Sequence, residues 1–305
     1  MKIMITGGNG MVGRNLLDHP LASKFSILSP SRAEVDLFAK LAIGTFLEAN
    51  RPDLIVHSAG KVGGIKANIA DPAGFFRQNL VMGMNLLEAA RDAGVNRIIN
   101  LGSTCMYPRE AENPLVEESI LTGGLEPTNE GYALAKIGVQ RLGAYMSAGS
   151  HEFQVKTIIP CNLYGPYDKF DEVNAHLIPA IIRKLHTAVA NGDQHVSIWG
   201  DGTARREFMY AQDLAALVWM ACERFDELPD LMNAGLGHDY SVTEYYEAAR
   251  RVTGFEGDFI YDPSQPTGMR QKLASSSRAN DLGWKASTDL DDGLRKTYQY
   301  FKGIA

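Results

Sequence analysis

Tyr132 and Lys136 stand four residues apart in a segment with helical character. Residues at this spacing share one face of a helix, which places the phenol near the ammonium. A nearby cation stabilises a phenolate, so we expect the pKa of Tyr132 to fall below its ordinary value of about 10. Tyr132 would then donate a proton to a substrate carbonyl near neutral pH, with Lys136 tuning it. The alternative is a surface pair without a catalytic role.

Ser103 and Cys105 follow an apolar run, Arg97–Leu101, that predicts a strand. Side chains two positions apart in an extended segment point to the same side, so we expect both in one cleft. The Ser103 hydroxyl would bind the same carbonyl as Tyr132, and together they would stabilise an oxyanion. A thiol, whose ordinary pKa is about 8.5, is a plausible base if a cation lies nearby. Alternatively, Cys105 is a small buried hydrophobe, and we interpret the other two cysteines in this way.

Gly7, Gly10 and Gly13 lie between the first predicted strand and the first predicted helix. Small residues are needed where the backbone turns tightly and a pyrophosphate contacts a helix N-terminus. A strand–turn–helix corner without a ligand is the alternative, but the position at the start of a βαβ unit favours dinucleotide binding. Followed by Ser103, Tyr132 and Lys136, the glycines indicate hydride transfer between a carbonyl and an alcohol.

The residues after the second predicted strand bear on which nicotinamide cofactor is bound. An acidic residue there binds the ribose 2′-hydroxyl of NAD, whereas a cation suits the 2′-phosphate of NADP. Ser31 and Arg32 occupy this position and favour NADP(H). Against this, Glu34 lies close to the expected acidic position, and Arg32 could be a solvated loop residue.

Short apolar runs alternate with helical segments through the first half of the chain. This pattern predicts an α/β fold with a doubly wound parallel sheet, the Rossmann type. Strands are expected at residues 2–5, 25–28, 54–57, 97–101 and 155–159, and helices at 11–17, 71–94 and 132–146. Later segments predict helices at 178–185 and 290–301 and a strand at 196–199. We therefore expect an NADP-binding domain over 1–165 and a smaller α/β substrate lobe over 166–305, with some segments returning to the first domain.

The composition excludes several classes of protein. The chain has 305 residues, of which 45% are hydrophobic and 22% charged, and this is typical of a globular protein without a membrane span. A formal charge of −6 leaves no basic footprint for a nucleic acid. Three cysteines without Cys/His spacing argue against a disulfide framework, a zinc site or any other metal centre. They fit a reducing, cytoplasmic location.

Longer strings of sequence extend these local signals. They lie at residues 59–68, 101–108, 126–136, 162–166, 174–179, 199–202 and 206–208. In these strings the chain resembles the extended short-chain dehydrogenase/reductases, and within them the GDP-L-fucose synthases. The resemblance covers residue 3 to about residue 284. It implies a homodimeric enzyme that epimerises C3 and C5 of GDP-4-keto-6-deoxy-mannose and then reduces C4 with NADPH.

The resemblance also implies roles for individual residues. Tyr132 would be the proton donor in reduction, Lys136 its modulator and a cofactor ligand, and Ser103 a hydrogen-bond partner of the carbonyl. Cys105 and His176 would be the base and the acid of epimerisation. The implied cofactor contacts are Gly7, Gly10, Met11, Val12, Gly13, Arg32, Asp36, Leu37, Leu101, Gly102, Ser103, Lys136, Pro160, Asn162, Leu163 and His176. The implied substrate contacts are Lys184, Trp199, Arg206 and Lys272.

Some of these residues have other interpretations. His176 could be a helix cap or a surface histidine, and Trp199 could be a packing residue. Arg206 can fork across two phosphate oxygens and Lys184 adds a point charge, as a nucleoside diphosphate requires. Each of these two cations alone would more often be a solvated surface residue.

Three positions of the substrate lobe depart from the family pattern. Ser275 stands where the family usually has aspartate, Thr267 after Pro266 replaces another aspartate, and Arg270-Gln271 replaces Pro-Arg. These departures weaken the inference about the sugar or base more than the inference about the chemistry. A GDP-linked 4-keto-6-deoxyheptose, or another related nucleotide sugar, is therefore an alternative substrate.

Two other functions stay open. One is a plain 4-ketoreductase of a nucleotide sugar, against which Cys105 and His176 argue, because reduction alone needs neither. The other is a non-catalytic NADP-sensing module, which would be expected to have lost Tyr132 or Lys136.

Overall fold

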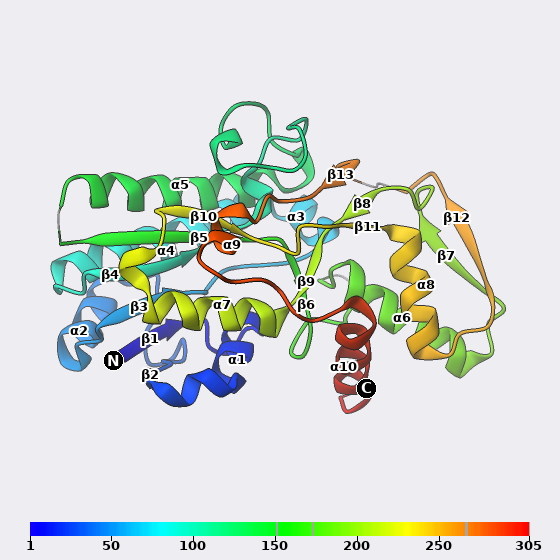
Figure 1. Cartoon of the computed structure of the whole chain (residues 1–305), viewed down its shortest axis with the longest axis horizontal. Helices are drawn as coiled ribbons and strands as arrows, with labels where there is room; N and C mark the ends of the chain where they lie inside the picture. The colour runs from blue at the N-terminus through cyan, green and yellow to red at the C-terminus, as the bar shows by residue number, and fades with distance from the viewer. Residues whose placement is uncertain (151, 173, 266–267, 305) are drawn as a thin grey trace.

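A six-stranded parallel sheet forms one lobe of the protein (Figure 1). The computed structural model describes residues 1–150, 152–172, 174–265 and 268–304. The strand order is β10-β5-β4-β3-β1-β2, and every neighbouring pair is parallel. The strands are β1 (Lys2–Thr6), β2 (Ser26–Leu28), β3 (Leu54–His57), β4 (Arg97–Leu101), β5 (Gln154–Pro160) and β10 (Leu231–Ala234). The predicted doubly wound α/β fold is confirmed.

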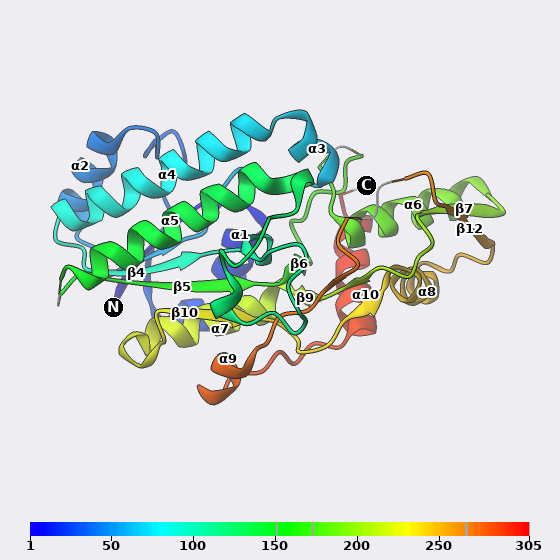
Figure 2. The same ribbon diagram turned by 90° about the horizontal axis from the view of Figure 1, so that it is seen from above.

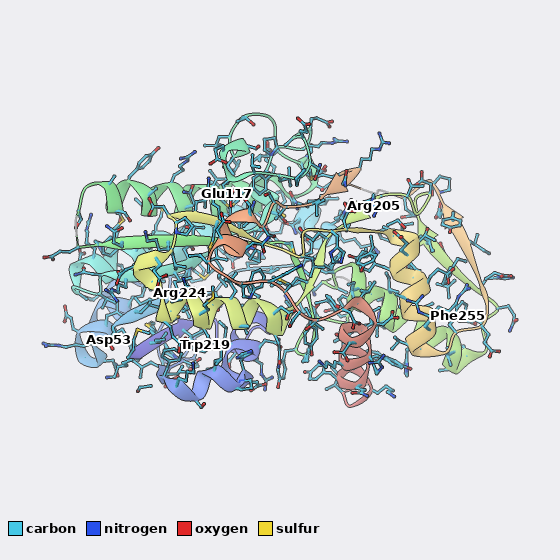
Figure 3. The ribbon with its side chains drawn as sticks, in the orientation of Figure 1. Asp53, Glu117, Arg205, Trp219, Arg224 and Phe255 are labelled. Atoms are coloured by element: carbon cyan, nitrogen blue, oxygen red, sulfur yellow. The ribbon has the colours of Figure 1, made fainter. Side chains whose placement is uncertain are left out.

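Helices cover both faces of this sheet (Figures 1 and 2). One face carries α2 (Lys40–Asn50), α4 (Pro72–Asp92) and α5 (Glu130–Ala148), and the other carries α1 (Met11–Asp18) and α7 (Ala211–Glu223). Trp219 of α7 is fully buried, and its Nε1 donates to the Leu16 carbonyl of α1 at 3.0 Å (Figure 3). Because both faces are covered, central strands such as β3 are buried throughout and read as continuous apolar runs.

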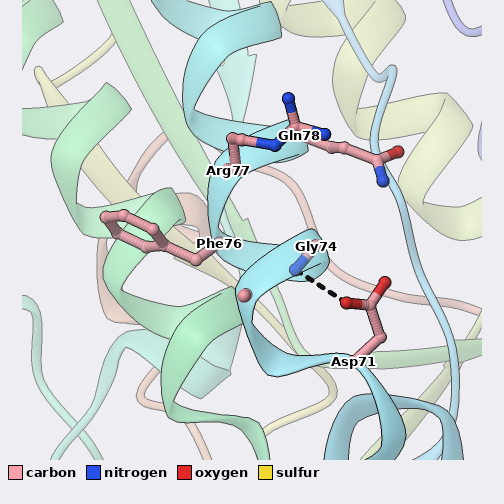
Figure 4. Close-up of a pocket in the computed structure, with 6 residues that line it drawn as sticks. Asp71, Gly74, Phe76, Arg77 and Gln78 are labelled. Carbon is pink, nitrogen blue, oxygen red and sulfur yellow. Dashed lines mark hydrogen bonds between the residues drawn. The ribbon is translucent and has the colours of Figure 1, made fainter.

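The longest helix of the described chain, α4, begins where the sequence predicts. The Asp71 carboxylate accepts a hydrogen bond from the Gly74 backbone at 2.9 Å, and Pro72 occupies the first helical position (Figure 4). A side-chain cap and a proline at this position both stabilise a helix N-terminus. Gly94, just beyond the end of the helix, has φ +72°, a conformation that glycine adopts without strain.

The second lobe is built from shorter sheets and three helices with an aromatic-rich core. Its helices are α6 (Leu177–Asn191), α8 (Val242–Thr253) and α10 (Leu290–Lys302). Its strands form the pair β7 (His195–Trp199) and β12 (Asp258–Asp262), and the three-stranded sheet β11 (Tyr240–Ser241), β8 (Arg205–Arg206) and β13 (Gln271–Lys272). The predicted helices at 178–185 and 290–301 and the strand at 196–199 lie within α6, α10 and β7.

The chain passes between the lobes more than once. After α6 and β7, it pairs β9 (Phe208–Tyr210) with β6 (Asn162–Tyr164) and then returns to the first lobe as α7 and β10. β10 extends the large sheet by pairing with β5. The short helix α9 (Ser277–Asp281) packs near β10, whereas α3 (Ile65–Ala70) follows β3. The first sheet is therefore completed by residues that come long after position 165.

Within the described ranges, no helix has both the length and the hydropathy that crossing a membrane requires.

Candidate active site

The first three glycines of the predicted site line a tight corner between β1 and α1. Gly7 has φ +75°, and a Cβ atom on it would lie 2.7 Å from the Ala59 backbone. A Cβ on Gly13 would overlap the Gly7 carbonyl oxygen. Gly10 caps α1 without any side-chain hydrogen bond, so the first backbone N–H groups, from Met11 on, have no side-chain cap. This glycine-lined cradle fits the pyrophosphate of a dinucleotide.

In the loop after β2, the acidic residue Glu34 makes a hydrogen bond within the loop itself. The Glu34 carboxylate accepts a hydrogen bond from the Ser31 backbone at 2.8 Å, and this bond lowers the pKa of Glu34. Arg32 is exposed, with its guanidinium 5.5 Å from the centre of the Phe38 ring. The carboxylate that could have bound a ribose is thus engaged by the loop itself, whereas the cation is exposed.

Two further cofactor candidates belong to the same loop. The Asp36 carboxylate accepts from the Phe38 backbone at 3.1 Å, and the Leu37 carbonyl accepts from the Asn85 amide at 3.1 Å. These bonds fix the backbone of the loop against α4.

The remaining cofactor candidates lie at the same edge of the sheet. β4 ends at Leu101, followed by Gly102, and β5 ends at Pro160; both strands run parallel to β1. The carboxyl ends of parallel strands meet at one edge, where open α/β sheets bind ligands. Asn162 continues this edge, since its amide donates to the Glu207 carbonyl at 3.1 Å, and Leu163 follows it in β6.

Ser103 and Cys105 come together through a turn. β4 ends two residues before Ser103, and Thr104–Met106 form a 3₁₀ turn. The Ser103 hydroxyl accepts from the Cys105 backbone N–H at 3.3 Å and so caps this turn. The expectation of an extended segment is wrong here, because the serine competes for the backbone hydrogen bond of the strand.

Tyr132 and Lys136 lie on the first turns of α5, facing the Ser103 turn. The Lys136 ammonium donates to the Leu101 carbonyl at 2.8 Å and lies 5.8 Å from the centre of the Tyr132 ring. Burial lowers the pKa of Lys136 to about 8. Burial raises the pKa of Tyr132, and the negative charge of Cys105 adds to this, while a hydrogen bond with Ser103 opposes it. The predicted lowering of the Tyr132 pKa is wrong, because burial removes water from the phenol and the Lys136 ammonium is directed to the Leu101 carbonyl instead.

The Cys105 sulfur accepts hydrogen bonds from two nitrogen donors. The Asn129 amide lies 3.3 Å from Sγ, and the Lys272 ammonium, from the second lobe, lies 3.4 Å from it. The cation that the sequence argument required is therefore present. Cys105 is partly exposed, unlike Cys161 and Cys222, which are buried.

His176 immediately precedes α6, at the boundary of the two lobes. Its side chain makes no capping hydrogen bond, so the capping interpretation does not apply. Burial lowers its pKa to about 4, and the charges of Lys169 and Lys272 act in the same direction. The imidazole is therefore neutral at neutral pH, the form that accepts a proton.

The other three substrate candidates, Lys184, Trp199 and Arg206, belong to the second lobe. The Lys184 ammonium donates to the Ser197 carbonyl at 2.7 Å, and Trp199, at the end of β7, is 36% exposed. Arg206 pairs in register with Lys272, and burial lowers its pKa. Two cations and a partly exposed ring can bind the phosphates and the base of a nucleotide.

Comparison with known proteins shows to which family the chain belongs. The sequence model of the NAD dependent epimerase/dehydratase family matches residues 3–235. The chain belongs to this family. A GDP-L-colitose synthase of Yersinia pseudotuberculosis is 50% identical over 301 residues, which are 99% of this chain and 98% of the relative. A GDP-L-fucose synthase of Azorhizobium caulinodans is 47% identical over 300 residues, covering 98% and 96%. The resemblance seen in the sequence is confirmed.

Solved structures of GDP-heptose enzymes share the fold of this epimerase/dehydratase family member. A GDP-6-OMe-4-keto-L-xylo-heptose reductase of Campylobacter jejuni matches with a TM-score of 0.92 at 27% identity, covering 100% of this chain and 98% of the other. A GDP-mannoheptose C4 reductase of Campylobacter jejuni with NADP bound matches with a TM-score of 0.88 at 28% identity, covering 99% and 98%.

Sequence reasoning missed three residues of this site in the family member. Asn129 lies within a string that carried the resemblance, but nothing in the string shows that its amide contacts Cys105. The Lys66 ammonium lies 5.0 Å from the centre of the Trp199 ring and joins the two lobes. His57 is buried and bonded to the Thr6 hydroxyl at 2.8 Å; burial and the charge of Lys136 lower its pKa to about 3.

The departures from the family pattern have local partners. The Ser275 backbone donates to the Leu115 carbonyl at 2.9 Å, and the Gln271 amide donates to Asp239 at 2.7 Å. The Arg270 carbonyl accepts from the Arg205 backbone at 2.9 Å. Pro266 and Thr267 lie outside the described residues. In the part of the chain that the structure describes, no group of three or more His, Cys, Asp or Glu side chains could hold a metal ion.

Proposed function

We propose that this protein is an NADPH-dependent epimerase/reductase that converts GDP-4-keto-6-deoxy-mannose to GDP-L-fucose, or acts on a closely related GDP-4-keto-6-deoxy sugar. The observation that carries the proposal is the placement of Cys105, beside the Lys272 ammonium and close enough to Tyr132 and Lys136 for its negative charge to favour the protonated form of both groups. Cys105, as the base that removes a proton from carbon, and Tyr132, as the acid that protonates the ketone oxygen, would then act in one site. Close relatives named for GDP-L-colitose and GDP-L-fucose synthesis support the substrate class.

Reduction requires a proton donor at the ketone oxygen. Gly7, Gly10 and Gly13 would hold the pyrophosphate of NADPH, which would supply the hydride. The raised pKa of Tyr132 keeps its hydroxyl protonated, so it is ready to donate when negative charge develops on the carbonyl oxygen. Ser103 provides a second donor to the same oxygen, and Lys136 holds the Leu101 carbonyl in place.

Epimerisation requires a base and an acid at the carbons that flank the ketone. Protons there are acidic because the enolate places its charge on oxygen, where Ser103 and Tyr132 stabilise it. Cys105 takes the proton as a thiolate. His176 returns a proton, and the charge of an enolate beside it favours the imidazolium that this step needs.

The nucleotide would lie along the second lobe. Arg206 and Lys184 supply charge for the diphosphate and Trp199 a ring for the base, with Lys66 closing this end of the site from the first lobe. A reducing, cytoplasmic location suits the three free cysteines.

The product decides between the proposed function and its alternatives. The protein is incubated with NADPH and a panel of GDP-4-keto sugars, and the products are analysed by NMR. Inversion at C3 or C5 together with reduction supports the proposal. Reduction without inversion would favour the plain 4-ketoreductase, and no NADPH consumption with any keto sugar would favour the NADP-sensing module.

The first prediction concerns the choice of cofactor. We expect NADPH to bind more tightly than NADH, and Arg32→Ala to weaken NADPH binding by about 1.5–3 kcal/mol while sparing NADH, because only NADPH has a 2′-phosphate to accept a charge-assisted bond. Fluorescence titration measures both affinities. Arg91→Ala, an exposed arginine of α4, is the matched control. Equal affinities of the unaltered protein for the two cofactors would overturn the assignment.

The second prediction is that the protein forms a homodimer. The helices α4 and α5 lie side by side (Figure 2). They expose Phe76, Met84 and Leu134, of which Phe76 is labelled in Figure 4. Two copies of such a helix pair, related by a two-fold axis, would bury these residues in a four-helix interface. We expect Leu134→Glu to halve the mass measured by light scattering. Leu41→Glu, an equally apolar exposed position on α2, should leave it unchanged. A monomeric mass for the unaltered protein would contradict the proposal.

A further inference from the structure

Lys272 is a lysine inside the protein whose ammonium touches a sulfur. Its side chain is 8% exposed, and its Nζ lies 3.4 Å from Cys105 Sγ. Among the described residues, no carboxylate lies within 4 Å of this ammonium. A buried cation without a counter-ion is costly. The group in contact with it that can carry a negative charge is the Cys105 thiol.

We propose that Lys272 is the counter-ion of a Cys105 thiolate and that Asn129 orients the same sulfur, so that these two positioning residues make Cys105 the base. The resemblance implied a substrate contact for Lys272, and the geometry assigns it this other task. The inference deepens the proposed epimerase function and rests on it. In the step that it supports, the thiolate forms an S–H bond with the substrate proton. The C–H electron pair forms a C=C bond, and the π electrons of the ketone move to its oxygen, which gives an enolate.

The hydrogen bonds around the sulfur fit an anion. An ammonium has three N–H donors and no acceptor, so its contact with Sγ requires the sulfur to accept. The Asn129 amide donates to the same sulfur at 3.3 Å. A thiolate accepts such bonds far better than a thiol, and an opposite charge within about 4 Å favours it further.

The backbone holds Lys272 in this position. β13 pairs with β8, which places Lys272 opposite Arg206, and the Lys272 carbonyl accepts from the Glu207 backbone at 3.2 Å. The next residue, Leu273, donates its N–H to the Asn113 side chain at 2.8 Å. These bonds hold β13 in place, so that the Lys272 ammonium of the second lobe lies against the Cys105 sulfur of the first lobe.

The other charged or titratable groups that face the sulfur are consistent with this arrangement. From α5, Lys136 adds a second positive charge, and burial raises the pKa of Tyr132, with the charge of Cys105 acting in the same direction. At the start of α6, burial lowers the pKa of His176, and the charges of Lys169 and Lys272 add to this effect. The thiolate and Lys272 therefore reinforce what burial already does, which is to keep Tyr132 protonated and His176 neutral until an enolate forms.

Alkylation of Cys105 tests the ion pair without any sugar substrate. Iodoacetamide reacts with thiolates, and the other two cysteines are buried, so mass spectrometry can follow Cys105 alone in the NADP⁺-loaded protein. Removing the charge with Lys272→Met should lower the rate at pH 7 by about tenfold or more and move the alkylation profile to higher pH. Lys272→Arg should largely restore it, and Lys285→Met, an exposed lysine outside the site, should match the unaltered protein.

Two further measurements keep the test decisive. Asn129→Leu removes the second donor and should shift the profile in the same direction, which covers the case that Lys272→Met does not fold. NADPH binding and circular dichroism identify a folded variant. An unchanged alkylation profile in folded Lys272→Met overturns the ion pair, even if the unaltered enzyme epimerises. Conversely, a shifted profile in a protein that exchanges no sugar protons would support the ion pair and refute the proposed epimerase.

Discussion

Replacing Tyr132 with phenylalanine is expected to slow NADPH-dependent reduction by a factor of about 10²–10⁴, the range of a lost general acid. The ring itself should keep its place, because it packs edge-to-face on Phe75 with ring centres 6.4 Å apart. Lys136 should keep its bond to the Leu101 carbonyl, since that bond does not involve the phenol. NADPH binding and the fold are therefore expected to persist while turnover is lost.

The measurement is single-turnover oxidation of NADPH with a GDP-4-keto sugar that the unaltered enzyme reduces. Tyr145→Phe serves as the matched control, because it removes an exposed phenol from the same helix. Fluorescence titration with NADPH shows whether the cofactor site is intact. Near-normal turnover in Tyr132→Phe would contradict the proposal that Tyr132 donates the proton in the reduction.

Replacing Cys105 with serine is expected to separate the two reactions of the site. A serine hydroxyl has no accessible anion near neutral pH, so proton exchange at C3 and C5 should slow by about 10²–10⁴. Reduction depends instead on Ser103, Tyr132 and Lys136, which stay in place. A ketone that needs no epimerisation should still be reduced, and the variant should release sugar whose flanking carbons keep their configuration.

Deuterium incorporation from heavy water at C3 and C5, followed by NMR of the product, measures this effect. His176→Gln should show a related defect, because the enolate then lacks its proton donor on the correct face. Parallel NADPH oxidation with the ketone that needs no inversion reports the intact reductive step. If Cys105→Ser exchanges the protons at C3 and C5 as fast as the unaltered protein does, Cys105 is only a packing residue. That result would favour the plain 4-ketoreductase.

Local sequence signals predicted the parts of the fold and site that depend on near neighbours. The glycines of residues 7–13, the pair Tyr132 and Lys136, and the long helix that begins after Asp71 are all set by spacing or capping within a few positions. The strands of the first half were visible for the same reason. The strand β10 was not, because its sequence Leu-Met-Asn-Ala contains none of the β-branched residues that indicate a strand.

Features that depend on burial or on distant contacts escaped the sequence. The pKa of Tyr132 rises because surrounding protein removes water, and no spacing reports that. Lys272 meets Cys105 across 167 positions, so only the folded chain brings a cation to the thiol. The turn at Ser103 was misjudged because its hydroxyl competes with the strand for a backbone hydrogen bond.

The strand β10 is synthesised long after β5, the strand with which it pairs, and this order affects folding during translation. Until residues 231–234 leave the ribosome, β5 presents a bare edge of unpaired N–H and C=O groups to any other extended chain. The emerging polypeptide must also close a long loop, containing much of the second lobe, before that edge is covered. Nascent chains that stall after residue 165 are therefore candidates for chaperone binding or edge-to-edge aggregation.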